Sequence, residues 1–137
     1  MPKARVTRRL HFSAGHRLHS PDYDDEKNRA VFGACSNPNG HGHNYELEVT
    51  VEGEIDPETG YVLDVKRLRD LVNDRVVAEI DHANLNVDVS WLQGVNPTAE
   101  NLTVQIWNRL TGRLDGARLV SVKLWETQRN HVEYCGE

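Results

Sequence analysis

Two histidines separated by one glycine are the residues of this sequence whose spacing points most directly to chemistry. His41 and His43 precede Tyr45–Glu52, a run in which apolar and polar residues alternate with the period of a half-buried strand. If the extended conformation begins at His41, both imidazoles point to the same face, because side chains two positions apart do so in a strand. Two imidazoles on one rigid edge supply two ligands of a three-histidine zinc site.

A third histidine ligand would have to come from another part of the chain. His16 follows a predicted first strand and adjoins Gly15, where another backbone segment can approach closely. On spacing alone, His11 and His19 compete with it. Three neutral imidazoles with an open fourth position are typical of a catalytic zinc, which polarises a substrate oxygen or acidifies a bound water.

Three further side chains are candidates for proton transfer. Cys35 precedes the turn-forming segment Asn37–Gly40, which favours an exposed, reactive thiol over a buried small hydrophobe. Asp81 and His82 follow a predicted helix, where the carboxylate can orient the imidazole and stabilise its protonated form. A polar helix end is an equally good interpretation of that pair on local sequence alone.

Glu126 follows a row of apolar residues on one face of a predicted strand. Val122 and Leu124 share one face of a predicted strand, and Glu126 is next on the same face. A carboxylate at that position needs a partner or a ligand. It can accept two parallel N–H bonds, which suits the guanidine-like edge of a pterin or a guanine. The competing interpretation is that the strand has already reached solvent.

Alternating and helical patterns predict the elements that must position these side chains. Strands are expected at residues 6–12, 45–52, 118–126 and 131–134, with a short remnant at 61–63. Helices are expected from Val65 to Ile80, after the N-cap Asp64, and from about residue 97 to 110, with Asn96 or Thr98 as N-cap. The charged stretch 22–29 lacks apolar periodicity and is predicted to be a surface loop. This order is typical of an α+β domain with two helices on one face of an antiparallel sheet.

The composition predicts one soluble domain spanning residues 1–137. Hydrophobic residues make up 38% of the chain and charged residues 27%, as in globular proteins. The net charge of −5 speaks against a nucleic-acid binder. No apolar run approaches the ~20 residues that span a bilayer, and no secretory signal is visible, so we expect a cytoplasmic protein with free thiols.

Six ordered segments resemble the 6-pyruvoyl-tetrahydropterin synthase family, and the resemblance covers nearly the whole chain. They are residues 12–18, Cys35 followed after five residues by 41–45, then 53–60, 81–86, 98–101 and 126–127. The resemblance implies the tunnelling fold, in which a four-stranded antiparallel sheet carries two helices on one face. Subunits of that fold form trimeric barrels, and two trimers stack into a homohexamer with active sites at subunit interfaces.

The resemblance also implies roles for the candidate residues. It implies one Zn²⁺ per subunit bound by His16, His41 and His43. It implies that Cys35 is the general base and that Asp81 and His82 take part in proton transfer. It implies that the pterin is held by Glu126, with Thr98 and Glu100 near its ring.

The implied reaction converts 7,8-dihydroneopterin triphosphate to 6-pyruvoyl-tetrahydropterin with elimination of triphosphate, with Mg²⁺ accompanying the triphosphate. Zinc would bind the side-chain hydroxyls of the substrate, and no external reductant would be needed. The residues that bind the triphosphate are left open, with Lys27, Arg29 and Arg17 as candidates.

Two other functions compete with this one. The segment Asn96–Ala99 resembles the 6-carboxytetrahydropterin synthases of queuosine biosynthesis, which use the same substrate and release acetaldehyde. In that branch three residues usually separate the cysteine from the histidine pair, whereas five separate Cys35 from His41 here, as in the pyruvoyl branch. We give the loop beside Cys35 more weight than the segment at the start of the helix, so the pyruvoyl product is the expected one. A zinc-containing pterin binder without turnover is disfavoured, because such a protein would not need Cys35, Asp81 or His82.

Overall fold

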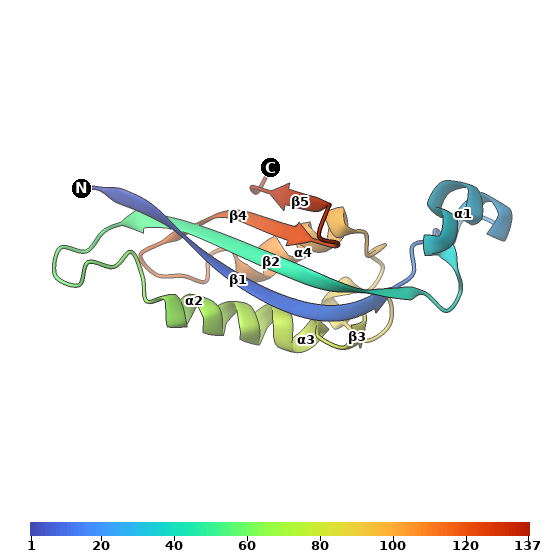
Figure 1. Cartoon of the computed structure of the whole chain (residues 1–137), viewed down its shortest axis with the longest axis horizontal. Helices are drawn as coiled ribbons and strands as arrows, with labels where there is room; N and C mark the ends of the chain where they lie inside the picture. Colours follow the sequence, from blue (N-terminus) through green and yellow to red (C-terminus); the bar gives the residue numbers. More distant parts are fainter.

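The computed structural model describes residues 1–137 as a five-stranded sheet with helices packed against one face and one short helix beyond its end (Figure 1). Its two longest strands, β1 (Lys3–His16) and β2 (His41–Glu54), pair antiparallel over their whole length. The strands β4 (Arg118–Trp125) and β5 (His131–Tyr134) continue the sheet antiparallel on the side of β2. The predicted antiparallel arrangement of four main strands is confirmed.

The remaining strand, β3 (Ala83–Asn84), was not predicted. It has two residues and pairs parallel with β1 at the edge of the sheet, opposite Ala14 and Gly15. The strand order is therefore β3-β1-β2-β4-β5, and the sheet is mixed. A strand of two residues has no alternating pattern that a sequence can display, which explains why it escaped prediction.

The helices are α1 (Asp25–Phe32), α2 (Val65–Val72), α3 (Ala78–Ile80) and α4 (Ala99–Leu110). A π-helical turn, Asn73–Val77, joins α2 to α3, so the predicted helix from Val65 to Ile80 is continuous but contains one widened turn. Short 3₁₀ turns cover Gly33–Ser36 and Ser90–Leu92. No helix combines the length and apolar character that crossing a membrane requires.

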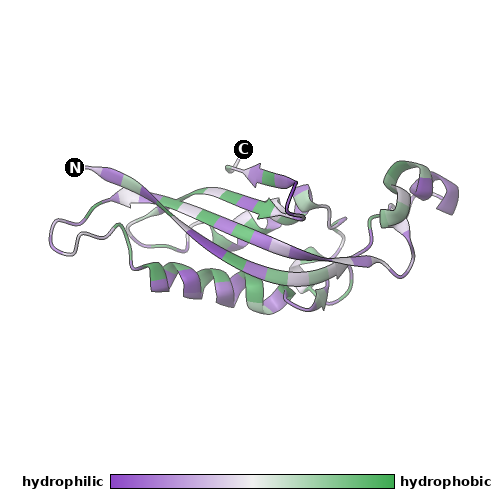
Figure 2. Ribbon diagram, viewed as in Figure 1, coloured by the Kyte–Doolittle hydropathy of each residue, from purple (hydrophilic) through white to green (hydrophobic).

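The core lies between the helices and one face of the sheet. Hydrophilic and hydrophobic residues alternate along the strands (Figure 2). The inward-facing positions of β1, β2 and β4 join the buried faces of α2 and α4 in one cluster of 19 buried residues. Within that cluster Phe12 and Tyr45 stack with ring centroids 4.7 Å apart. The side chains that follow these inward positions toward one end of the sheet are the candidate site residues.

Two sequence predictions are wrong. Residues 22–29 are not a loop throughout, because α1 begins at Asp25, where the side chain of Asp24 caps it by accepting the N–H of Lys27 at 2.8 Å. This helix buries only Asn28, so it has no apolar stripe to detect. Residues 61–63 form no strand; the carbonyl of Tyr61 instead accepts the N–H of Asp56 and closes a loop.

Candidate active site

Three histidines meet at the end of the β1–β2 pair. His16 lies directly opposite His41, and Ala14 lies opposite His43, so the three rings share the face that carries the core. Their candidate ligand nitrogens lie within 4.8 Å of one another. His16 is only 2% exposed. The two competing histidines are outside the cluster: His11 is exposed, and its position in β1 places it on the other face of the sheet.

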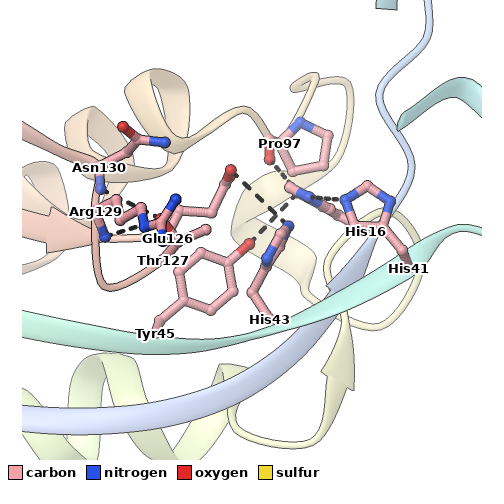
Figure 3. Close-up of polar contacts among 9 residues, drawn as sticks. All are labelled: His16, His41, His43, Tyr45, Pro97, Glu126, Thr127, Arg129 and Asn130. Atoms are coloured by element: carbon pink, nitrogen blue, oxygen red, sulfur yellow. Dashed lines mark hydrogen bonds and ion pairs between the residues drawn. The ribbon is translucent and has the colours of Figure 1, made fainter. Parts of the chain in front are cut away.

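The ring of His16 is oriented by a backbone carbonyl (Figure 3). Its Nδ1 lies 2.7 Å from the carbonyl oxygen of Pro97, and the hydroxyl of Tyr45 lies 3.5 Å from the same nitrogen. A carbonyl only accepts hydrogen bonds, so Nδ1 carries the proton and Nε2 presents its lone pair toward His41. Neither Pro97 nor Tyr45 was predicted; the position of Tyr45, two residues after His43, is the signal that could have found it.

The geometry of these nitrogens fits a metal ion. The Nε2 atoms of His16 and His41 lie 3.1 Å apart. Two imidazole ligands of a tetrahedral zinc, each bonded at about 2.0–2.1 Å, would be separated by about 3.3 Å. The Nε2 of His43 is buried and has no hydrogen-bond partner. A buried nitrogen without a partner is costly unless something else binds it, and a metal ion would do so.

Burial also favours the neutral, metal-binding form of two of these rings. Desolvation lowers the pKa of His16 and of His43, although the negative charge of Glu126 partly opposes the effect in both. A neutral imidazole has the lone pair that a metal ligand needs. The cluster of His16, His41 and His43 could therefore hold a metal ion.

Glu126 faces this cluster from the end of β4. One of its carboxylate oxygens lies 3.9 Å from Nε2 of His43, which is too far for a hydrogen bond. No lysine or arginine forms an ion pair with it, so the carboxylate has acceptor sites free for a ligand. Its loop is held by Thr127, whose hydroxyl accepts the N–H groups of Arg129 and Asn130, each at 3.2 Å.

A cavity of about 590 Å³ lies beside Glu126 and His43. Its lining comes from the middle of β1, the first half of β2, the end of β4 and the loop after β4: Arg9, Gly42, His43, Asn44, Glu46, Trp125, Glu126, Thr127 and Gln128. This volume lies within the range of small-ligand pockets. The predicted pterin-binding carboxylate therefore lines a cavity that it shares with a predicted metal ligand.

Thr98 and Glu100 lie at the start of α4. Thr98 is the N-cap, as one of the two alternatives predicted, and its hydroxyl accepts the N–H of Asn101 at 3.1 Å. Because it directly follows Pro97, it is close to the carbonyl that holds His16. Glu100 is exposed in the first helical turn.

Asp81 and His82 form a local pair at the end of α3. One oxygen of Asp81 accepts the backbone N–H of Ser13 at 2.9 Å, and the other lies 3.1 Å from Nδ1 of His82. The Ser13 hydrogen bond and, to a lesser extent, the His82 contact lower the pKa of Asp81. His82 has a positive φ of 62° and a side chain that is 82% exposed. With His43 it lines a cavity of about 350 Å³.

Cys35 lies on the 3₁₀ turn Gly33–Ser36 and is half-buried with a free thiol. Its carbonyl accepts the N–H of Leu18 at 2.8 Å, which ties this turn to the end of β1. No hydrogen bond or ion pair joins Cys35 to Asp81 or His82. One copy of the chain therefore brings the histidines and Glu126 together but does not link the cysteine to the aspartate–histidine pair by a hydrogen bond or ion pair.

Comparisons with known proteins agree with this fold. The family model described as 6-pyruvoyl tetrahydropterin synthase matches residues 5–137. A 6-pyruvoyl tetrahydrobiopterin synthase of Pongo abelii is 48% identical over 135 residues, which cover 98% of this chain and 93% of that protein. The solved structure of 6-pyruvoyl tetrahydropterin synthase from Caenorhabditis elegans has a TM-score of 0.92 and 36% identity, covering 100% of this chain and 98% of that one.

A relative with another activity also matches. The 6-carboxy-5,6,7,8-tetrahydropterin synthase of Rickettsia typhi is 29% identical over 147 residues, which cover 94% of this chain and 98% of that protein. The pyruvoyl-type relative is thus considerably more similar than this carboxy-type one. The match of almost the entire chain to one family model and to close relatives shows that the chain belongs to the 6-pyruvoyl tetrahydropterin synthase family.

Proposed function

We propose that this chain is a zinc-dependent 6-pyruvoyl-tetrahydropterin synthase and that residues 1–137 act as one synthase domain in the cytoplasm. It would convert 7,8-dihydroneopterin triphosphate to 6-pyruvoyl-tetrahydropterin and triphosphate. The observation that carries this proposal is the partly buried His16–His41–His43 cluster facing a Glu126 carboxylate that lacks a basic partner. The names of the similar relatives supply the reaction.

His16, His41 and His43 would hold the zinc ion. When bound, zinc would polarise the hydroxyls of the substrate side chain and make the neighbouring C–H more acidic. The carbonyl of Pro97 would keep His16 in the tautomer that leaves Nε2 free for the metal.

Glu126 would orient the substrate by accepting two N–H bonds from the pterin ring. The carboxylate lines a cavity of about 590 Å³ and forms no ion pair with lysine or arginine. A charge-assisted, two-point contact fixes both the position and the in-plane rotation of a planar heterocycle. Thr98 and Glu100, at the start of α4, would lie near the ring.

Proton transfer would involve Cys35 and the Asp81–His82 pair. The Cys35 thiolate would remove a proton from the substrate side chain, and the electrons of that C–H bond would pass toward the pterin ring, which gains a proton in turn. Asp81 stays anionic because the Ser13 N–H lowers its pKa, so it can hold Nδ1–H of His82 and leave Nε2 to exchange a proton. This transfer reduces the ring and oxidises the side-chain carbon. Triphosphate would then leave with the electrons of its C–O bond as the neighbouring side-chain carbon loses a proton.

A neighbouring subunit would complete this site. Cys35 and the Asp81–His82 pair are both required by the proposed reaction, and no hydrogen bond or ion pair joins them within one chain. An assembly of trimeric barrels stacked into a homohexamer would allow His82, whose side chain is 82% exposed, to reach the cysteine of another copy.

The second candidate is 6-carboxy-5,6,7,8-tetrahydropterin synthase activity on the same substrate. The segment Asn96–Ala99 favours it, and the carboxy-type relative of Rickettsia typhi shows that this activity occurs among proteins similar to the chain. The five-residue spacing between Cys35 and His41 favours the pyruvoyl product. A zinc-containing pterin binder without turnover is a lesser alternative.

Product analysis tests the proposal. The purified, zinc-loaded protein is incubated with 7,8-dihydroneopterin triphosphate and Mg²⁺, the pterin product is identified by mass, and acetaldehyde is assayed. We expect 6-pyruvoyl-tetrahydropterin, triphosphate and no acetaldehyde. A carboxy product accompanied by acetaldehyde would establish the second candidate, and substrate binding without any product would establish the third.

A further inference from the structure

One arginine lies between two polar cavities beside the histidine cluster. Arg17 directly follows His16 and lines both of them. The first cavity, of about 380 Å³, is lined by Gly15, His16, Arg17, His19, Pro38, Asn39, Gly40, His41, Asn84, Asn86 and Val87. The second, of about 280 Å³, is lined by Arg17, Asp25, Asn28, Arg29, Ser36, Asn37 and Pro38. The two cavities together lead from the metal ligands to the N-terminal part of α1.

Arg17 is held in place by polar contacts that leave most of its guanidinium unpaired. Its Nε–H donates to the carbonyl of Ser36 at 2.8 Å. The side chain of Asn86 accepts the backbone N–H of Arg17 at 2.7 Å and donates to its carbonyl at 2.9 Å. No carboxylate lies within ion-pair distance, and the terminal guanidinium nitrogens donate to no protein acceptor. Arg17 is therefore a positioned cation with four free N–H donors.

The other side chains that line these cavities add one more cation and only one acidic group. Arg29 lines the second cavity, is exposed, and has no ion-pair partner. His19 lines the first, and its Nδ1 is buried without a hydrogen-bond partner. Asp25 is the single acidic residue in either lining. Lys27 lines neither cavity, because its ammonium lies 4.0 Å from the centre of the Tyr23 ring.

We propose that Arg17, together with Arg29, binds the polyphosphate tail of the substrate. This inference rests on the proposed function, which places the reacting side chain of the substrate at His16 and His41. A guanidinium whose Nε–H is already hydrogen-bonded and whose terminal nitrogens are free can donate to two phosphate oxygens at once. The tail would run from the metal ligands past Arg17 toward Arg29, and Lys27 would have no part in binding it.

Inorganic tripolyphosphate is the probe for this site, measured by titration calorimetry on the zinc-loaded protein. We expect Arg17→Gln to weaken tripolyphosphate binding about tenfold or more, as loss of a charge-assisted hydrogen bond does. The KM for dihydroneopterin triphosphate should rise by a similar factor. Binding of unphosphorylated neopterin and the zinc content should change less than about twofold. Arg67→Gln is the matched control, because Arg67 is exposed on α2 and forms no ion pair.

A second variant guards against a local folding defect in Arg17→Gln. Asp25→Asn removes the one acidic side chain that lines the second cavity with Arg17 and Arg29, so it should tighten tripolyphosphate binding about two- to threefold. Equal tripolyphosphate affinity in Arg17→Gln and Arg67→Gln, or no gain in Asp25→Asn, would overturn the inference. If the wild type is active and the KM of Arg17→Gln is unchanged, the phosphate site is refuted but the proposed function is not. If the protein binds tripolyphosphate through Arg17 but shows no turnover, the proposed function is refuted but the phosphate site is not.

Discussion

At the scale of single residues, a buried histidine can serve as a metal ligand only when its two ring nitrogens have different partners. His16 meets this condition, since Nδ1–H donates to the carbonyl of Pro97 and Nε2 lies 3.1 Å from Nε2 of His41. His43 presents a buried nitrogen with no hydrogen-bond partner, and Glu126 stands 3.9 Å from it. The proposed metal ligands and the proposed pterin anchor are thus adjacent groups, and substitutions can test them separately.

Substitution of Glu126 tests the pterin contact. Glu126→Gln keeps the size of the side chain but removes the charge and one pair of acceptor sites. We expect pterin affinity to fall by at least about tenfold, because two charge-assisted hydrogen bonds are lost. Isothermal titration with neopterin measures this, and metal analysis should find the zinc content unchanged. Unchanged neopterin affinity would exclude Glu126 as the pterin anchor.

The lowered pKa values of His16 and His43 predict how acid affects the metal-free protein. Above the ordinary value of 6.5 both rings are neutral in the folded and unfolded chains, and their titration contributes nothing to stability. As the pH falls below that value, the unfolded chain takes up protons first, so the free energy of unfolding decreases until the pH passes the lower folded values.

Urea unfolding in the presence of a chelator, from about pH 7.5 to about pH 5, measures this effect. The free energy of unfolding should decline toward acid, and the decline should be smaller in His43→Gln, which removes one of the two groups. A decline of the same size in both proteins would show that other residues cause it.

At the scale of elements, the turn before β2 positions the first histidine of the pair. Gly40 has a φ of +71°, which an L side chain adopts only with strain, and a Cβ there would lie 2.7 Å from the carbonyl oxygen of His16. The turn therefore needs glycine both for its conformation and for its close approach to β1. Gly60 has a similar φ of +77° but open space around it, so it offers a control for strain without the clash.

We expect Gly60→Ala to lower the free energy of unfolding by about 1–2 kcal/mol, from backbone strain alone. Gly40→Ala should cost at least about 1 kcal/mol more, because the new methyl group must displace the backbone of His16. Urea denaturation of both variants measures the difference, and Gly40→Ala should also bind zinc more weakly. Equal destabilisation of the two variants would mean that the contact with His16 is unimportant.

The elements that the sequence predicts well are those with a clear period. The alternation in β2 extends back to His41 as expected, and the register of β4 carries Glu126 to the face of the histidines. The helix α1 escaped prediction because only Asn28 is buried in it, so its cap at Asp24 was the one available signal. Hydrophobic periodicity detects elements that bury a face, and α1 does not.

At the scale of the whole molecule, the site depends on contacts between distant segments that no local pattern displays. The Pro97 carbonyl reaches His16 across 81 positions, and the side chain of Asn86 holds the backbone of Arg17 across 69. Residue types and spacing predicted that His41 and His43 share one face, whereas spacing alone did not choose among His11, His16 and His19 as the third member of the cluster. The groups that orient them are backbone atoms or amides, which any sequence contains, so only the folded chain identifies them.

The zinc content of the purified protein and of two variants decides whether the histidine cluster is a metal site. We expect one zinc per chain in the wild type and little or none in His43→Ala. We expect full occupancy in His11→Ala, since His11 is exposed and lies outside the cluster of His16, His41 and His43. A wild-type chain that takes up no zinc, or a His43→Ala variant that keeps a full complement, would show that the cluster is not a zinc site.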